Sequence, residues 1–312
     1  MNDTIKERIQ TLRAWMKQTG IEAFIIPSTD PHLSEYVAPH WQSREWISGF
    51  TGSAGTVVVT ENEAGLWTDS RYFLQAAQQL EGTDIDLYKE MLPETPSIPA
   101  FLSEQLKKGQ SVGIDGKVFA TDAARSLQKE LENNGITLKC TADQMEQIWD
   151  GRPEMPQAPA FIHDTKYAGR TCAEKLEAIR AEMKKAKADS LLLSALDEIA
   201  WTLNLRGSDV HCNPVVVSYL LIGENEAHYF INSQKVTPEV AAHLHEAGVS
   251  LHTYQEIESY LAQLPAENLM LEPGKTNYAV RSAIPQQCRV IEVPSPVALL
   301  KAVRNEQEVA GL

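Results

Sequence analysis

An internal repeat is the feature of this 312-residue sequence that most restricts its fold. The tetrapeptide Glu-Asn-Glu-Ala occurs at residues 61–64 and again, unchanged, 163 residues later at 224–227. Each copy lies between two apolar segments, which is typical of a turn joining two antiparallel strands. One supersecondary unit written twice predicts a duplicated domain rather than one large core.

Further segments recur in the same order. In each half an apolar stripe with helical spacing precedes a short run typical of a buried strand. The stripes are Ile5, Ile9, Leu12, Trp15 and Met16, then Leu176, Ile179, Met183 and Ala186, and the strands are 23–26 and 191–194. The other matches are two helix-opening caps (28–30 and 194–197), two glycine-containing turns (48–53 and 205–208), two β-branched strands (56–59 and 215–218) and two strand–helix junctions (112–117 and 269–275).

The repeat predicts an α/β protein of two tandem duplicated domains, each a mixed β-sheet flanked by helices. Each copy has the size of an ordinary domain. We place the domains at 1–154 and 160–301. The segment 151–159 holds three prolines, which neither a helix interior nor a central strand tolerates, so we expect a linker there.

Charge and hydropathy exclude several classes of protein. The formal net charge is −14, which repels a phosphate backbone and argues against nucleic-acid binding. The densest basic cluster, Lys184, Lys185 and Lys187, fits the solvated face of a helix. No apolar run has the roughly 20 residues that a membrane span needs, and the charged N-terminus is unlike a secretory signal, so we expect a cytoplasmic protein with no membrane partner.

Cysteine and histidine patterns point to packing and solvation more than to chemistry. Cys140, Cys172, Cys212 and Cys288 are far apart, and we expect four reduced thiols. His243 and His245 stand two positions apart on a predicted helix, which is the wrong spacing for a shared metal, so we expect both to face solvent. The neighbours His211 and Cys212 could be read as base and nucleophile, but we favour a packed loop.

Two motifs in the first half carry a family resemblance. They are Phe50-Thr51-Gly52-Ser53-Ala54-Gly55 and the segment from Leu66 to Phe73. In the second half Leu196-Asp197-Glu198-Ile199-Ala200-Trp201, the run from Leu203 to Val210, and Asn213-Pro214 strengthen it, as does Ile148-Trp149-Asp150-Gly151-Arg152-Pro153 between them. The whole chain resembles the two N-terminal domains of three-domain cytosolic Xaa-Pro aminopeptidases (aminopeptidase P).

The resemblance implies that each half has the creatinase/prolidase N-terminal fold, with ribonuclease-H-like topology. It implies a third, pita-bread catalytic domain that is absent from this chain, so that residues 302–312 begin it. In the family, that domain holds two divalent metal ions, usually manganese, through two Asp, one His and two Glu. A metal-bound hydroxide there attacks the bond before proline and releases the N-terminal residue.

For this chain the resemblance therefore implies a non-catalytic role, with no catalytic residue, no metal ligand and no bound cofactor of its own. Its partners would be a peptide with proline in second position and its own C-terminal catalytic domain, and a homodimer is compatible. Arg71 and Tyr72 would lie on the rim of the substrate cleft, where a guanidinium fork suits a carbonyl or carboxylate. An ion pair of Arg71 with Asp69, and a core position for Tyr72, are the alternatives.

Three other interpretations remain open from the sequence. Ribonuclease-H-like nucleases hold two metals with clustered carboxylates, and Asp30, Asp69 and Asp115 could take those roles, although the acidic charge opposes it. The aromatic stretch 36–46, with Tyr36, His40, Trp41 and Trp46, could line a substrate entrance or a subunit contact. Finally, the chain could be a stand-alone protein-interaction module that has lost its peptidase domain.

Overall fold

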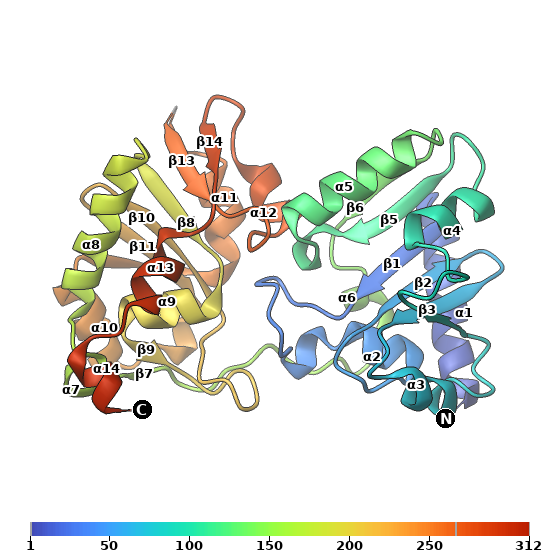
Figure 1. The fold of residues 1–312 in the computed structure, drawn as a ribbon, viewed down its shortest axis with the longest axis horizontal. Helices are drawn as coiled ribbons and strands as arrows, with labels where there is room; N and C mark the ends of the chain where they lie inside the picture. Colours follow the sequence, from blue (N-terminus) through green and yellow to red (C-terminus); the bar gives the residue numbers. More distant parts are fainter. Residues whose placement is uncertain (1, 266, 312) are drawn as a thin grey trace. The chain divides into compact units, whose positions relative to one another are not determined.

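The computed structural model describes residues 2–265 and 267–311 (Figure 1). They form two compact units, and we describe each by itself. The first comprises residues up to 31 together with 39–154, and the second comprises 32–38 together with 155 onwards. The second unit is thus discontinuous in sequence, since it includes a short segment that follows the first strand of the chain.

The first unit is built around one six-stranded sheet. Its strands lie in the order β4-β3-β2-β1-β5-β6. Strand β2 is antiparallel to both β1 and β3, whereas β4 is parallel to β3 and β5 and β6 continue parallel to β1. The strands are β1 (Ala23–Pro27), β2 (Thr56–Thr60), β3 (Ala64–Thr68), β4 (Asp86–Lys89), β5 (Ser111–Asp115) and β6 (Thr137–Thr141).

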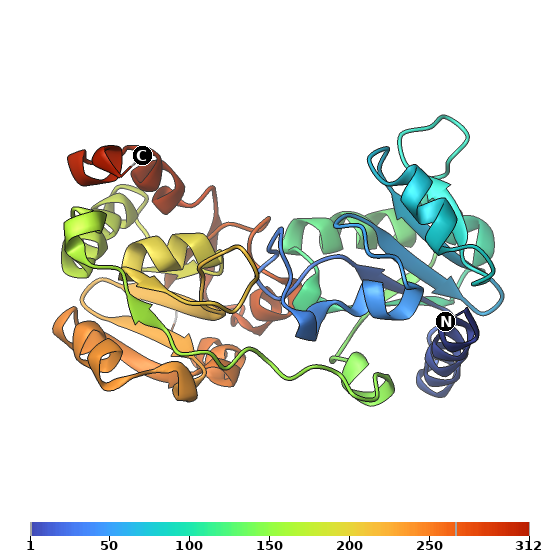
Figure 2. The same ribbon diagram turned by 90° about the horizontal axis from the view of Figure 1, so that it is seen from below.

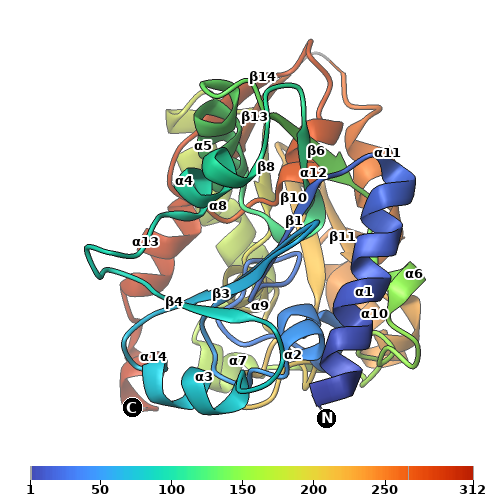
Figure 3. The ribbon, with the colours of Figure 1, turned by 90° about the vertical axis from the view of Figure 1, so that its right-hand side faces the viewer.

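Helices cover both faces of this sheet. Helix α1 lies on one face and α4 on the other (Figure 3). The apolar stripe of α1 packs on Phe24, Ile26, Val57 and Val59, whereas Trp67 points to the opposite face and contacts Phe101 of α4. Alternating strand residues therefore supply two apolar layers. The helices are α1 (Asn2–Thr19), α2 (Ser43–Ser48), α3 (Phe73–Gln79), α4 (Ile98–Gln105), α5 (Thr121–Glu132) and α6 (Met145–Ile148), with short 3₁₀ turns η1 (Pro39–Trp41) and η2 (Gly116–Val118).

The second unit repeats the same sheet. Its order is β12-β11-β10-β8-β13-β14, and each neighbouring pair has the orientation of its counterpart in the first sheet. The strands are β8 (Ser190–Leu193), β10 (Ser218–Gly223), β11 (Ala227–Ile231), β12 (Val249–Thr253), β13 (Asn268–Leu271) and β14 (Arg289–Glu292); β7 (Phe161–Ile162) and β9 (Leu205–Arg206) form a separate pair. The predicted α/β fold with two mixed, helix-flanked sheets is confirmed.

Helices of the second unit occupy matching places. Helix α8 packs on Leu191, Leu193, Leu220 and Ile222, as α1 does on the first sheet. The helices are α7 (Thr165–Ala168), α8 (Cys172–Lys185), α9 (Leu196–Leu203), α10 (Pro238–Glu246), α11 (Ile257–Leu261), α12 (Tyr278–Ala283), α13 (Pro296–Ala302) and α14 (Glu306–Ala310), with 3₁₀ turns η3 (Ser233–Lys235) and η4 (Tyr254–Glu256). Between α6 and β7 the chain has neither helix nor strand (Figure 2).

The repeated tetrapeptide forms the expected turn in both sheets. Residues 61–63 connect β2 to β3, and 224–226 connect β10 to β11. The helix contacts are also repeated: Arg13 of α1 donates from Nε to the Thr60 carbonyl, and Arg180 of α8 donates to that of Gly223, both over 2.9 Å. A basic side chain from the first helix thus fixes the end of the same strand in each unit.

Three local predictions were wrong. Residues 28–30 open no helix, because the chain continues irregularly to η1. The helix predicted to open at 194–197 is present as α9, but it begins after Ala195 without the predicted side-chain cap, and the Ser194 hydroxyl is buried. The run Val215–Val217 precedes the strand instead of forming it, since the strand equivalent to β2 is β10, beginning at Ser218. Burial of these valines in the loop explains why their composition resembled a strand.

Candidate functional site

The segment after β3 carries the two residues that the sequence singled out, Arg71 and Tyr72. Asp69 accepts hydrogen bonds from the Arg71 backbone N–H (3.0 Å), Nε (2.9 Å) and Nη2 (2.7 Å). The alternative of an ion pair with Asp69 is therefore present. The Arg71 side chain is still 66% exposed, so the carboxylate fixes its direction without covering it. These bonds hold the pKa of Asp69 below its usual value.

Tyr72 joins this segment to the glycine-rich loop. Its ring meets Phe50 edge to face at 5.8 Å between centroids, and its hydroxyl lies 2.6 Å from the Ser53 hydroxyl. The hydrogen bond with Ser53 is the main cause that lowers the Tyr72 pKa. The Arg71 guanidinium lies over the same ring at 5.2 Å. Tyr72 is half-buried, so it is neither a full core residue nor a free surface group.

Arg44 builds the loop beneath these residues, and sequence reasoning gave it no role. Its side chain is buried and donates from Nε to Ser28 Oγ (2.7 Å), and from its two terminal nitrogens to the carbonyls of Phe50 and Gly52. Desolvation lowers its pKa from the ordinary guanidinium value to about 10. Its burial could have been predicted from the sequence, because Arg44 lies three and four positions before Ile47 and Ser48 and so shares the inward face of α2 with them.

The aromatic stretch 36–46 divides among several roles. Trp41 is buried, and Trp46 stacks on Trp149 at 5.2 Å, with the Arg8 guanidinium 4.8 Å from its ring. His40 lies with Nδ1 2.7 Å from the Pro153 carbonyl. These three side chains act in packing within the first unit. Tyr36, which is 52% exposed, belongs to the second unit.

The carboxylates of the nuclease interpretation are not brought together as metal ligands. Asp30 and Asp115 are buried, Asp115 accepts from the Lys117 N–H, and Asp69 is engaged by Arg71. Burial raises the pKa of Asp115 to about 6. Within residues 2–265 and 267–311, no group of three or more His, Cys, Asp or Glu is arranged to hold a metal ion.

The histidine and cysteine candidates differ in how far they are exposed. His245 is exposed as predicted, but the prediction was wrong for His243, which is half-buried with Nε2 2.8 Å from the Leu203 carbonyl. His211 and Cys212 are exposed in a surface turn, so the predicted packed loop is also wrong. All four cysteines are free thiols. No helix in the described part of the chain is long and apolar enough to cross a membrane.

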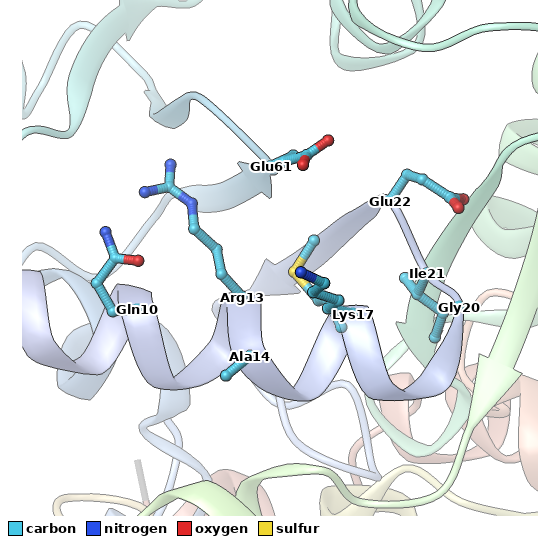
Figure 4. A pocket seen from close by; sticks show the side chains of 9 residues that line it. Gln10, Arg13, Ala14, Lys17, Gly20, Ile21, Glu22 and Glu61 are labelled. Atoms are coloured by element: carbon cyan, nitrogen blue, oxygen red, sulfur yellow. The ribbon is translucent and has the colours of Figure 1, made fainter.

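A surface pocket of about 420 Å³ lies at the end of α1 (Figure 4). Arg13 and Lys17 line it from the helix, Glu61 from the β2–β3 turn, and Glu22 from the position just before β1. Glu22 also accepts from the Ser111 N–H at 2.7 Å. In the second unit the Asp189 carboxylate likewise accepts from the Asn268 backbone N–H, and Arg180 makes the bond that Arg13 makes in the first. The pocket residues Glu22 and Arg13 therefore have structural counterparts in both units.

Comparison with known proteins identifies both units. Residues 8–148 and 151–308 each match a family model described as a creatinase/prolidase N-terminal domain. Aminopeptidase P2 of Arabidopsis thaliana is 36% identical over 99% of this chain and 48% of its own length. A probable Xaa-Pro aminopeptidase P of Botryotinia fuckeliana is 37% identical over 98% of this chain and 48% of its own length.

A solved structure agrees with these relatives. The X-prolyl aminopeptidase of Caenorhabditis elegans, described as a cytosolic enzyme with a di-nuclear active site, matches 99% of this chain and 53% of its own with a TM-score of 0.93 and 32% identity. The chain thus spans about half the length of the relatives it matches. With two repeated sheets and two matching family models, it belongs to the creatinase/prolidase N-terminal domain family, as a tandem pair homologous to the N-terminal half of aminopeptidase P.

Proposed function

We propose that this chain acts as the non-catalytic N-terminal part of a metal-dependent Xaa-Pro aminopeptidase. Such an enzyme removes the N-terminal residue from a peptide with proline in second position. The observation that carries the proposal is the continuous similarity to aminopeptidase P over 98–99% of the chain, combined with a TM-score of 0.93 to a solved X-prolyl aminopeptidase.

The proposed role of the two domains is to shape the substrate cleft and to exclude long or folded substrates. Arg71 is the residue to which we assign contact with the peptide, and Tyr72 forms the adjoining wall. The clamp by Asp69 supports this assignment, because an exposed guanidinium held in one direction loses less conformational entropy when it binds a carbonyl or carboxylate. Arg44 positions the loop from which Ser53 orients Tyr72.

Metal chemistry enters this proposal only through residues outside the chain. The described residues offer no fitting set of ligands, so no step is assigned to a metal here. We propose that two divalent ions, manganese by family analogy, are held by the catalytic domain, which residues 302–312 begin. The proposed partners are that domain, the peptide substrate and a second copy in a homodimer, and the proposed location is the cytoplasm.

The test is a manganese-supplemented assay of Arg-Pro-Pro cleavage, run on this chain and on the full reading frame. We expect arginine release by the longer protein alone. Cleavage by the 312-residue chain would contradict the non-catalytic role, and a reading frame that ends at Leu312 would favour the stand-alone interaction module.

Substitution of Arg71 in the active, longer protein tests the rim assignment. Arg71→Ala should raise KM for Arg-Pro-Pro several-fold, and Arg71→Lys should recover only part of the loss because a lysine lacks the guanidinium fork. Lys184→Ala, on the exposed face of α8, is the matched control. Equal kinetics for Arg71→Ala and the control would remove Arg71 from the substrate cleft.

A further inference from the structure

The face of the first sheet that α4 covers carries an apolar aromatic cluster. Trp67 of β3 stacks on Tyr88 of β4, with ring centroids 4.0 Å apart and planes within 3°. Phe101 of α4 meets both rings edge to face, at 5.0 and 5.4 Å. Gly65 makes room for this stack, since a Cβ there would lie 2.5 Å from the Tyr88 ring and 2.7 Å from that of Trp67. The cluster has no group that titrates near neutral pH.

The second sheet has the same cluster with different chemistry. Phe230 of β11 pairs in register with His252 of β12, as Trp67 pairs with Tyr88, and their rings stack at 4.9 Å. Tyr260 of α11 takes the place of Phe101 and contacts both rings. His228 stands where the first sheet has Gly65. The first sheet therefore builds the same strand and helix arrangement without either histidine.

The polar groups of this second cluster form a continuous chain. His228 Nδ1 lies 3.0 Å from His252 Nε2, and His228 Nε2 lies 3.0 Å from the Tyr260 hydroxyl and 3.4 Å from the Glu226 carboxylate. The His228 side chain is only 12% exposed. One imidazole nitrogen must donate and the other must accept for the two rings to bond.

This arrangement accommodates one added proton but not two. A protonated His228 donates from Nδ1 to neutral His252, and from Nε2 to the Tyr260 oxygen or to Glu226. If His252 is protonated as well, both facing nitrogens carry hydrogen, the bond between them is lost, and two like charges stand 3.0 Å apart in a half-buried site. The second protonation therefore opposes the packing of β12 and α11 on the sheet.

The surrounding charges do not cancel this effect. Glu226 precedes β11, Glu256 lies in η4, and Glu267 follows α11; Glu256 acts on His252, and the other two act on Tyr260. Burial first, and then the charge of His228, lower the pKa of His252 despite Glu256. The folded-state pKa of His252 thus lies below the unfolded value of about 6.5. The resulting stability is fully present above the unfolded pKa and is lost as the pH falls from that value towards the folded-state pKa.

We propose that His228, His252 and Tyr260 form a proton-sensitive latch that holds the edge strand β12 and helix α11 to the second sheet. The latch is closed when the two imidazoles share at most one proton, and it opens when the second proton binds. The equivalent cluster of the first sheet, Trp67, Tyr88 and Phe101, makes the same packing contact without a histidine, so we expect that contact to be independent of pH. Acidification thus loosens one edge of the second unit and leaves the corresponding edge of the first unchanged.

Imidazole proton resonances of the unaltered chain give the first test. We expect the histidine pair to titrate in two separate steps, because coupled groups release their protons as a pair. A single shared step for His228 and His252 would overturn the latch.

Hydrogen exchange of the backbone amides, followed by mass spectrometry, gives the second test. After correction for intrinsic rates, amides of β12 and α11 should exchange several-fold faster at pH 5 than at pH 7.5, because the second protonation breaks the bond between the two imidazoles. The amides of β4 and α4 should show no such change.

The matched variant copies the first sheet into the second. H228G/H252Y replaces the two histidines by the residues found at the equivalent positions, and it should abolish the acid-dependent exchange of β12. Persistence of that dependence in a folded H228G/H252Y chain would assign the effect to other groups. If the variant does not fold, the titration of the unaltered chain decides the proposal by itself.

Discussion

The two units share one sheet order and one pattern of strand directions, yet they fix their loops by different means. In the first unit a single buried Arg44 donates to two loop carbonyls and to the Ser28 hydroxyl. The second unit relies on ion pairs with buried carboxylates. Lys235 and Asp209 are both buried, whereas Glu198 is buried but its partner Lys275, at 2.6 Å, is 38% exposed. The two units therefore have the same strand order but hold their loops with different charged residues.

The difference teaches which part of the structure each kind of residue determines. Apolar residues at strand and helix spacing are interchangeable within a layer, because burial depends mainly on area and shape. A buried charge instead needs partners in one geometry, since an unpaired charge in the interior is costly. Loops held by such charges can diverge between copies. The candidate residue Arg71 stands beside one of them, since its neighbour Tyr72 bonds to Ser53 of the loop that Arg44 holds.

Breaking the Lys235–Asp209 pair should have the largest effect on the comparison. Lys235→Met leaves the buried Asp209 carboxylate without its cation, and we expect a loss of about 3–5 kcal/mol in the stability of the second unit. Denaturant unfolding monitored by hydrogen exchange in β8 and β10 measures this loss.

The control for that variant is Lys185→Met, which removes the exposed pair of Lys185 with Glu182. An exposed pair of this kind contributes about 0.3–0.5 kcal/mol. Equal losses for Lys235→Met and Lys185→Met would mean that burial of the charge does not set the cost.

Adding one methyl group to the first aromatic cluster should have an intermediate effect. Gly65→Ala places a Cβ within 2.7 Å of two stacked rings that cannot both move aside, and we expect a loss of about 1–3 kcal/mol. Thermal unfolding together with exchange in β3 and β4 measures it. Gly223→Ala is the control, because its Cβ would meet nothing nearer than 3.5 Å. If Gly65→Ala is as stable as the control, steric crowding does not explain why the first cluster has glycine where the second has His228.

Removing the Arg71 side chain should have the smallest effect on stability. Its pair with Asp69 is largely exposed, so Arg71→Ala should change the free energy of unfolding of the first unit by less than about 1 kcal/mol. Denaturant unfolding of Arg71→Ala beside Asp69→Asn checks this. A larger loss for Arg71→Ala would show that Arg71 supports the fold, and any loss of activity in the longer protein would then need that correction.

Much of the frame could be predicted from the repeat. The first helix, the central strand and the hairpin at the Glu-Asn-Glu-Ala turn were correct in both halves, because periodic burial is a local signal. The errors at 28–30 and 215–217 fall in loops, where buried valines have the composition of a strand but continue no ladder. The candidate site was predicted only in part: Asp69 and Arg71 are neighbours in sequence, whereas the contact of Arg44 with Gly52 depends on how the loop folds back.

The short segment 32–38 determines when the second unit can be complete during synthesis. His32 is buried there, with its two ring nitrogens 2.9 Å from the Ser194 carbonyl and from the Tyr254 hydroxyl. These residues leave the ribosome early, more than 150 residues before their partners. A fragment expressed from residue 155 would therefore fold around a vacant histidine site, and adding a peptide of residues 32–38 in trans should restore its missing protection.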